Sequence, residues 1–436
     1  MGLLIGTGNT MPEFAYNYYY GIEWDATVSN PVPTRIGKTE LHRSLPVQSQ
    51  MRRCLLKDNG TVNYYLHPND SSKRDNGAAA NLTGADGQFM VELPDAYMRF
   101  EVDGDKCRAM MSDRPLPGFI KWRKDYVSAD EACVQRSTNT LCAVVNSDAD
   151  YRGGDNDSSF DSTDRTLLGR PATNINLSDF RAYARARGSI AWNCYLYQTH
   201  RKLWWFFAIE YCNFNSQAPF NAALTADGMR QGGLGTGVSV SGSKWNAWNH
   251  YRPFIPCGHT LSLGNHTGIV NYTMPASYDN NSGLIVAVPS YRGVTNPFGH
   301  IWKLADGCLC NIQSEAAGGK SEFYVCDTPA NFANAVYSGY QLRGNLPRQE
   351  GFIKALILGE HGDIAPLTIG GSSTTFFCDY FGTSVPQSGS VTRCVSVGGS
   401  GDFGVSCGFL FMFTNRTPSE CFANQGSRLC YFPLSD

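Results

Sequence analysis

Residues 393–430 of the chain, RCVSVGGSGDFGVSCGFLFMFTNRTPSECFANQGSRLC, combine repeated glycines with aromatic and small polar side chains. Glycine permits turns and close backbone approach, so this stretch predicts a loop-rich scaffold and not a helix. Phe411, Phe413 and Phe422 stand among Gly, Ser and Asn, a mixture of aromatic anchors and adaptable polar groups that is typical of a binding surface. The alternative is that residues 409–413 form a buried strand with half of its side chains in the core.

The whole chain shares this character. It holds 45 Gly, 24 Phe, 22 Tyr and 8 Trp, while charged residues make up only 17%, below the roughly 25% of an ordinary soluble protein. A helical bundle needs Glu, Lys and Ala on its outer faces, so this composition favours short strands joined by ordered loops. We therefore expect an α+β fold with short twisted strands, two or three helices and long ordered loops.

The charge balance disfavours polyanionic partners. With 36 basic and 38 acidic residues the formal charge is -2, so no long-range field of one sign attracts nucleic acid or an anionic membrane. The opening MGLLIGTGNTMPEFAYNYYY lacks the basic region and apolar run of a secretion signal. No later segment approaches roughly 18 uninterrupted apolar residues. We expect no nucleic-acid binding and no membrane insertion.

Turn signals between β-like runs predict hairpins in the first part of the chain. The sequence DNG at residues 58–60 lies between two such runs, and DGD at residues 103–105 repeats the pattern. Residues 88–93, QFMVEL, are predicted to form another strand.

Three helices are predicted before Phe220, and the dense glycines predict none after it. The last of the three is apolar almost all round, so we expect it to be buried on most faces. The predicted ranges are 132–136 after the capping box Ser128-Ala129-Asp130-Glu131, 176–188 with a cap at Asn176 or Ser178, and 189–211.

The chain shows neither a linker nor an internal repeat. Residues 1–20 have a composition of their own, rich in Gly, Asn and Tyr, and form either an arm that attaches to a neighbouring protein or an edge strand of the body. We divide the chain into an N-terminal arm, 1–20, and one domain, 21–436.

Fifteen cysteines without a secretion signal indicate reduced, mostly buried thiols and not a disulfide framework. Two groups contain residue types that bind metals: Cys308 with Cys310, and Cys257 with His259 and His266. Neither group has the paired ligand spacing of a zinc site, so we expect no metal and no cofactor.

Three other segments each have two interpretations. The acidic stretch 148–164 is a solvated loop or, less favoured by its spacing, a calcium loop. The segment 245–251, WNAWNHY, either stacks on sugar rings or pins a long loop to the core. The run GLGTG at 233–237 lacks the Lys-Ser/Thr of a phosphate loop, which favours a structural turn. No Ser, Cys or His lies in a catalytic motif, so we expect no enzymatic activity.

Short motifs in order along the chain resemble the C-type lectin fold of the formylglycine-generating-enzyme type. The run NPFGHIWK at 296–303 is similar to that family's Gly-Asn-Val-Trp-Glu-Trp signature. Residues Gly426 to Cys430, GSRLC, resemble its closing strand, and the predicted helices at 176–211 lie where that fold carries its helices. The resemblance implies this fold for residues 21–436.

The C-terminal stretch resembles the variable region of proteins diversified by retroelements, whose relatives include phage tropism determinants and gut-phage tail proteins. In that family a fixed glycine scaffold displays variable side chains. The resemblance implies a ligand-binding region over 376–430, with Tyr380 and Phe381 on the same face as the diversified positions. Those positions would be Ser400, Asp402, Phe403, Ser406, Phe411, Phe413, Asn415, Arg416, Glu420 and Phe422.

These resemblances imply a phage tail or fibre-tip receptor-binding protein that adheres to a bacterial surface protein or glycan. It would attach to other virion tail proteins through its N-terminus, act as a homo-oligomer, and be made in the host cytoplasm before it joins the virion. A bacterial retroelement-diversified binding protein is the second hypothesis.

A formylglycine-generating-type oxidase is the third. That family places a Cys-x4-Cys pair before the closing strand, and here Cys407 is at the first position but Met412 is at the second. This departure removes the thiol and copper chemistry of the family, unless Cys394 or Cys421 approaches Cys407 in space.

Overall fold

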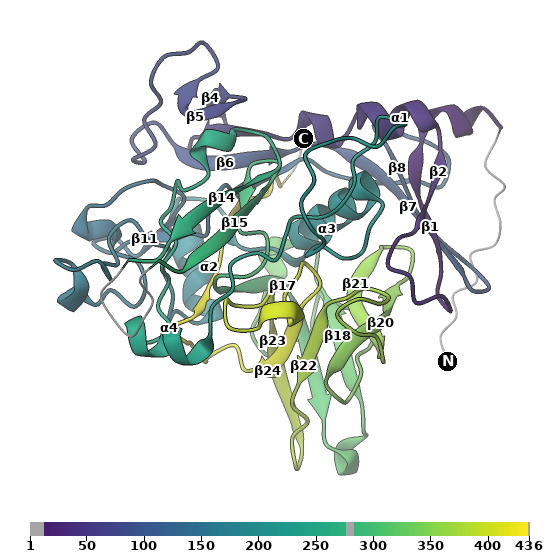
Figure 1. Cartoon of the computed structure of the whole chain (residues 1–436). Coiled ribbons are helices and arrows are strands. Elements are labelled where there is room, and N and C mark those ends of the chain that lie inside the picture. The colour runs from purple at the N-terminus through teal and green to yellow at the C-terminus, as the bar shows by residue number, and fades with distance from the viewer. Residues whose placement is uncertain (1–12, 276–282, 435–436) are drawn as a thin grey trace.

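The structure, a computed structural model, describes residues 13–275 and 283–434. The fold is mixed and consists mostly of strands in several sheets, with few helices (Figure 1). Within the described residues the α-helices are α1 (Thr39–Ser44), α2 (Leu177–Arg185), α3 (Tyr197–Tyr211) and α4 (Gly242–Asn249). Short 3-10 helices include Glu13–Tyr18, Gln48–Gln50, Ala149–Tyr151, Ser158–Phe160, Leu261–Leu263, Glu315–Ala317, Pro329–Asn331 and Gly404–Ser406.

Two sheets are built mainly from the first third of the chain. The five-stranded sheet has the order β2 (Thr34–Gly37), β1 (Tyr20–Asp25), β8 (Lys106–Ser112), β7 (Ala96–Asp103) and β9 (Ile120–Trp122). The seven-stranded sheet has the order β13 (Trp192–Cys194), β26 (Leu429–Tyr431), β10 (Asp125–Ser128), β6 (Gln88–Leu93), β3 (Arg52–Leu56), β4 (Val62–His67) and β5 (Asp70–Arg74). The C-terminal strand β26 thus enters a sheet whose other members lie more than two hundred residues earlier.

The largest sheet belongs to the C-terminal half and carries the predicted variable region. Its order is β19 (Gln341–Asn345), β18 (Ser321–Val325), β17 (Trp302–Gln313), β23 (Ser390–Val397), β24 (Met412–Arg416), β22 (Tyr380–Thr383), β20 (Gly351–Leu358) and β21 (Asp363–Ile369), with β25 (Gln425–Gly426) pairing with β17. Because β19 at one edge approaches β20 and β21 at the other, this sheet is nearly closed into a barrel. It occupies the lower part of Figure 1.

Two smaller sheets complete the β structure. They are the hairpin of β11 (Cys133–Gln135) with β12 (Thr140–Cys142), and the three-stranded sheet of β14 (Gly268–Thr273), β15 (Ile285–Tyr291) and β16 (Val294–Thr295).

Helix α3 lies inside the molecule, between the sheets (Figure 1). Its apolar side chains, including Trp204 and Phe207, are fully buried, which confirms the expectation that this helix is buried on most faces. Its charged side chains are also buried and are paired across to other elements. Lys202 Nζ lies 2.8 Å from Asp125 Oδ1, and two such contacts join Arg292 to Glu210 at 2.6 and 2.7 Å. These pairs fix the position of α3 because a buried charge left unpaired is costly.

Several local predictions are confirmed. The turn at 58–60 joins β3 to β4, the turn at 103–105 joins β7 to β8, and residues 88–93 form β6. Helix α2 begins after Asn176, whose side-chain oxygen accepts a hydrogen bond from the backbone N–H of Asp179 at 3.0 Å.

Three helix predictions are wrong. Residues 132–136 are not helical, because Cys133–Gln135 pairs with Thr140–Cys142 as a hairpin and Glu131 turns inward to buried His300 and Lys303. The start of the predicted helix 189–211 is strand β13, and only its later part is helical. Helix α4 lies in the region where no helix was expected. In each case tertiary pairing outweighs the local sequence pattern.

The predicted N-terminal arm lies partly outside the described residues, since the description begins at residue 13. Within the described part, Glu13–Tyr18 is a 3-10 helix, and Ala15 and Tyr19 are buried against Met110 and Leu116. Tyr20 begins β1, which lies between β2 and β8 and so is an interior strand of its sheet.

The guanidinium of Arg428 anchors the C-terminal strand. It is fully buried and donates to the carbonyl oxygens of Ser128 at 3.0 Å, Asn296 at 2.8 Å and Thr295. Hydrogen bonds to a charged donor in a dry interior are stronger than neutral ones. One side chain therefore joins the chain end to two segments that are distant in sequence.

We predict that Arg428→Met, which keeps most of the side-chain volume, lowers the free energy of unfolding by about 3–5 kcal/mol, because three buried carbonyl groups lose their donor. Chemical denaturation followed by tryptophan fluorescence measures this change. Arg416→Met, at a partly exposed arginine, is the matched control and should change stability by less than about 1 kcal/mol. Equal effects of the two substitutions would contradict the anchoring role.

Candidate functional site

Aromatic rings from three segments gather at the C-terminal half of the largest sheet. The ring of Trp302, at the start of β17, is nearly buried and stacks on Phe413 with centroids 5.2 Å apart. Its centroid lies 4.7 Å from that of buried Phe411 and 5.3 Å from that of Phe403. The Tyr380 ring packs edge-on against Phe411 at 5.8 Å. We call the partly exposed rings of Tyr380, Phe403 and Phe413 the aromatic face.

The strand pairing explains why these rings meet. Strands β22 and β24 are parallel neighbours, and Gly382 lies opposite Phe413. A Cβ atom on Gly382 would lie 2.2 Å from the Phe413 ring, so the absent side chain provides the space that the ring fills. Parallel strands require a long connection between them. The connection from β22 to β24 contains β23 and the glycine-rich loop that follows it.

The loop after β23 (398–411) is shaped by glycines with left-handed backbone angles. Gly399 has φ +77°, and a Cβ there would lie 2.6 Å from the sulfur of Cys407 and 2.8 Å from the Phe411 ring. Ser400 is buried, and its hydroxyl donates to Asp402 Oδ1 at 2.6 Å. The loop backbone is therefore fixed by packing, and it presents Phe403 beside Trp302.

A polar group continues from the aromatic face along β24 and the turn after it. The guanidinium of Arg416 lies 3.9 Å from the centre of the Phe422 ring and 3.8 Å from Glu420 Oε1. Glu420 Oε2 accepts hydrogen bonds from the backbone N–H and the hydroxyl of Thr417 at 2.7 and 2.9 Å. We call Arg416, Glu420 and Phe422 the polar rim.

The structure divides the twelve predicted site residues into two sets. Phe381, Ser400 and Phe411 are fully buried and so do not present a contact surface. Their inclusion as ligand contacts needs correction: Phe381 and Phe411 belong to the core, and Ser400 hydrogen-bonds within its loop. The partly exposed residues are Tyr380, Asp402, Phe403, Ser406, Phe413, Asn415, Arg416, Glu420 and Phe422.

Sequence reasoning missed two members of this region. Trp302 supports the rings of Phe403 and Phe413, yet the sequence singled it out only as part of a fold motif. Phe352, in β20, packs edge-on against Tyr380 at 5.2 Å. The motif at 296–303 contains Trp302 and was a usable signal for it. No sequence signal marked Phe352.

A buried carboxyl lies beneath the aromatic face. Asp379 is buried, and its Oδ2 accepts a hydrogen bond from the backbone N–H of Leu410 at 2.7 Å, while its Oδ1 has no hydrogen-bond partner among the described residues. Burial raises the pKa of Asp379 well above its usual value, so it favours the protonated carboxyl. Its uncharged state is compatible with the apolar packing around it.

Other segments that the sequence marks as candidate sites are engaged in contacts within the fold. In the acidic stretch 148–164, Asp155 pairs with Arg252 at 2.7 Å and Asp161 with Arg152 at 2.6 Å. In segment 245–251 the rings of Trp245 and Trp248 are buried in a core cluster, which favours the loop-pinning interpretation over sugar stacking. Residues 13–275 and 283–434 contain no group of three His, Cys, Asp or Glu side chains placed to hold a metal ion.

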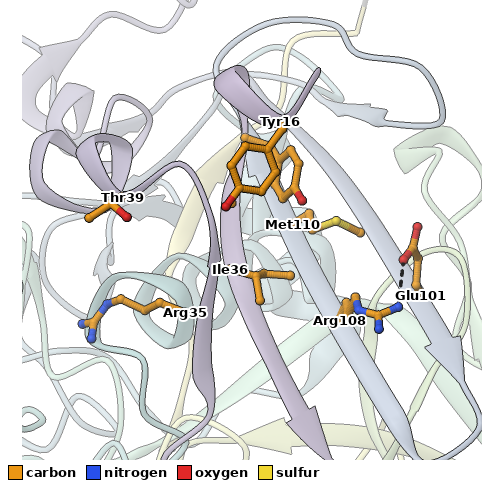
Figure 2. A pocket seen from close by; sticks show the side chains of 9 residues that line it. Tyr16, Arg35, Ile36, Thr39, Glu101, Arg108 and Met110 are labelled. Atoms are coloured by element: carbon orange, nitrogen blue, oxygen red, sulfur yellow. Dashed lines mark hydrogen bonds and ion pairs between the residues drawn. The ribbon is translucent and has the colours of Figure 1, made fainter. Parts of the chain in front are cut away.

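A shallow hollow lies far from the aromatic face, on the five-stranded sheet beside the first 3-10 helix (Figure 2). Its volume is about 450 Å³, and Tyr16, Arg35, Glu101 and Arg108 are among its lining residues. Arg108 is paired with Glu101 and Glu23, and Arg35 donates to three backbone carbonyl groups. These internal contacts give the charged side chains of the hollow a structural role.

The cysteines near the chain end do not form the pair that the oxidase hypothesis requires. Cys407 is buried and donates to the carbonyl oxygen of Ser400 at 3.2 Å. Cys394 donates to the carbonyl oxygens of Arg416 and Thr417, whereas Cys421 is exposed. Burial also raises the pKa of the Cys407 thiol, which opposes its use as a thiolate.

We predict that Gly382→Ala destabilises the protein by about 1–3 kcal/mol, because the new methyl group overlaps the Phe413 ring. Gly401→Ala is the matched control, since a Cβ there would meet its nearest neighbour at an ordinary 3.6 Å. Thermal unfolding of both variants measures the difference. A stable Gly382→Ala protein would contradict the close packing of this ring.

We predict that Asp379→Asn raises the free energy of unfolding at pH 7. The folded-state pKa is raised, so above pH 4 folding must return a proton to a carboxyl that is ionised in the unfolded chain, and stability falls as pH rises. The amide removes this dependence and can still accept the Leu410 N–H. Urea denaturation between pH 4 and pH 8 measures it, with exposed Asp227→Asn as control. An unchanged pH slope in Asp379→Asn would contradict the prediction.

The chain was also compared with known proteins. No protein-family model matches it, and no curated protein matches it. Within the described ranges, none of its helices combines the length and apolar character needed to cross a bilayer. The C-terminal half of the largest sheet, where the aromatic rings gather, stays the predicted binding face.

Proposed function

We propose that this chain is a receptor-binding protein of a phage tail or fibre tip, with a C-type lectin fold of the formylglycine-generating-enzyme type. It contacts a bacterial surface protein or glycan through the aromatic face and the polar rim. Binding, and not catalysis, is its activity.

The observation that carries this proposal is the layered packing of the aromatic face. Partly exposed Phe403 and Phe413 lie against Trp302, which is nearly buried, and buried Phe411 supports the same cluster. An aromatic side chain that is already held in place loses little conformational entropy on binding, so more of its contact energy appears as affinity. Such anchors are typical of the residues that dominate binding energy.

The polar rim supports the proposal in a second way. Arg416 and Glu420 carry opposite charges beside the Phe422 ring. Charges at the edge of an interface contribute more to the choice of partner and the rate of association than to affinity. A change of side chain at these positions would alter the partner that the surface selects.

Of the twelve predicted site residues, three are buried and nine are partly exposed. This division fits a diversified surface with fewer variable positions than the sequence predicts. Phe381, Ser400 and Phe411 maintain the scaffold, because a substitution there would disturb packing or the loop. The side chains at the nine partly exposed positions reach the surface, so their exchange disturbs less buried packing than a change at the three buried ones. We propose that diversification is confined to those nine.

The placement of the chain end supports the proposed lectin-type fold. Strand β26 pairs with β10 and β13, and Gly426 and Ser427 just before it are buried. Any side chain added at Gly426 would meet the carbonyl oxygen of Ala172 at 2.8 Å. The closing motif is therefore a structural element that holds the variable region against the body.

The proposed partners at the other end are neighbouring tail proteins, bound through the N-terminus. Several copies at one tip would bind a cell surface with higher avidity than one copy, so a weak single site suffices.

We predict that Phe403→Ala weakens attachment to susceptible bacterial cells about 10-fold or more, because a pre-positioned aromatic anchor is lost. Labelled full-length protein, titrated on a panel of strains, measures this, and thermal unfolding verifies that the variant is folded. Ile120→Ala removes an apolar side chain that is 41% exposed on β9, outside both the aromatic face and the N-terminal arm, and is the control.

The proposal predicts that Ile120→Ala attaches like the original protein. Equal attachment by Phe403→Ala and the original protein, or equal losses in both variants, would contradict the role of the aromatic face.

A further inference from the structure

Two buried thiols from distant segments meet beside the β11–β12 hairpin. Cys133 lies in β11, and Cys257 lies in the segment that follows α4, 124 residues later. Their sulfur atoms are 3.5 Å apart. Cys133 is fully buried and Cys257 is 8% exposed. Both thiols are free in the structure.

The backbone on both sides of this contact is anchored. The N–H of Cys257 donates to the carbonyl oxygen of Gly169 at 2.9 Å, and the N–H of Gly258 donates to Asp130 Oδ2 at 2.7 Å. Cys133 is held by its hairpin partner Cys142. The two sulfur atoms are therefore brought together by the fold. A bond of about 2.05 Å requires them to approach by less than 2 Å, which side-chain rotation and small shifts of the segment after α4 can supply.

The surroundings favour a dithiol and not a metal site. Val144 and Tyr151 pack beside the two thiols, and Cys142 is the third cysteine of this cluster. The nearby ring of His259 has its Nε2 atom 3.2 Å from the carbonyl oxygen of Asn271, so this nitrogen is already engaged. A structural zinc site needs four such ligands in tetrahedral arrangement.

We propose that Cys133 and Cys257 form a site of oxidative cross-linking, at which one intramolecular disulfide joins the β11–β12 hairpin to the segment after α4. The segment it would secure also donates the N–H groups of Phe254 and Ile255 to His300 Nε2, at 3.1 and 3.2 Å. His300 in turn contacts Glu131, two residues before Cys133. The disulfide would covalently join the two segments that this buried polar group already connects through hydrogen bonds.

The chemistry balances with a peroxide as oxidant. Cys257, the more exposed thiol, loses its proton and attacks one oxygen of hydrogen peroxide, which forms a sulfenic acid and releases water. The sulfur of Cys133 then attacks the sulfenic sulfur, a second water leaves, and the S–S bond forms. Two thiols and one peroxide give one disulfide and two waters, so the protein loses two electrons and two protons.

The biological consequence rests on the proposed function, although the chemistry does not. A tail protein is made in a reducing cytoplasm and acts outside the cell, where disulfides persist. The thiols would stay reduced during synthesis and assembly and become linked after release. The hydrogen bond with Cys133 and burial raise the pKa of the Cys257 thiol, which slows its oxidation.

Peptide mapping tests the proposal directly. Reduced full-length protein is treated with hydrogen peroxide, alkylated under denaturing conditions, digested and analysed by mass spectrometry. The expected result is one linked peptide pair that contains Cys133 and Cys257, with two fewer alkylated thiols per chain. The melting temperature of the oxidised protein should rise by several degrees, because the cross-link restricts the unfolded chain.

Two variants make the result specific. Cys257→Ala should show neither the linked peptides nor the rise in melting temperature, whereas Cys142→Ala, in the same buried cluster, should show both. A Cys133–Cys142 linkage, or oxidation confined to exposed Cys421, would overturn the proposal. Since neither readout involves attachment to cells, failure here is distinguishable from failure of the proposed receptor-binding function.

Discussion

The buried guanidinium of Arg428 holds the end of the chain inside the molecule, and the position of the candidate binding face depends on it. Its hydrogen bonds reach the backbone of Ser128 and of the segment at 295–296, which leads directly into β17. Strand β17 begins with Trp302, the ring on which Phe403 and Phe413 pack. Residues that are distant in sequence are thus brought into one continuous packed unit, and the aromatic face is its outer layer.

Buried charged side chains in this protein join segments that are distant in sequence. Next to Arg428, Glu131 is enclosed by His300 at 3.2 Å and by Lys303 at 3.2 Å. The pKa of His300 is lowered by burial, and its other ring nitrogen accepts backbone N–H groups, which suits a neutral imidazole that donates to Glu131. Lys303 also donates to the carbonyl oxygen of Gly299, so this buried group holds the segment that leads into β17.

The sequence permitted prediction of local features whose cause is local. The turn at 58–60, the cap at Asn176 and the burial of the apolar helix α3 follow from side-chain chemistry within a few residues. The capping box at 128–131 failed because Glu131 has stronger partners elsewhere in the fold. The local sequence pattern carries no information on partners that are so distant in the chain.

The binding face shows the same limit. Alternation along the strand does not separate buried Phe411 from partly exposed Phe413, since their rings lie two residues apart and both contact Trp302. The loop around Gly399 and the parallel pairing of Gly382 with Phe413 decide which of the two rings is buried and which reaches the surface. The sequence predicts the stretch as a candidate, and the packing divides it into buried supporting residues and partly exposed ones.

Deep sequencing of this gene across a natural population tests the central claim most directly. The account predicts that substitutions concentrate at the partly exposed positions, including Phe403, Phe413 and Arg416, while Gly382, Phe411 and Arg428 stay unchanged. Substitutions spread evenly over the stretch, or absent from the exposed positions, would contradict a diversified binding face on a fixed scaffold.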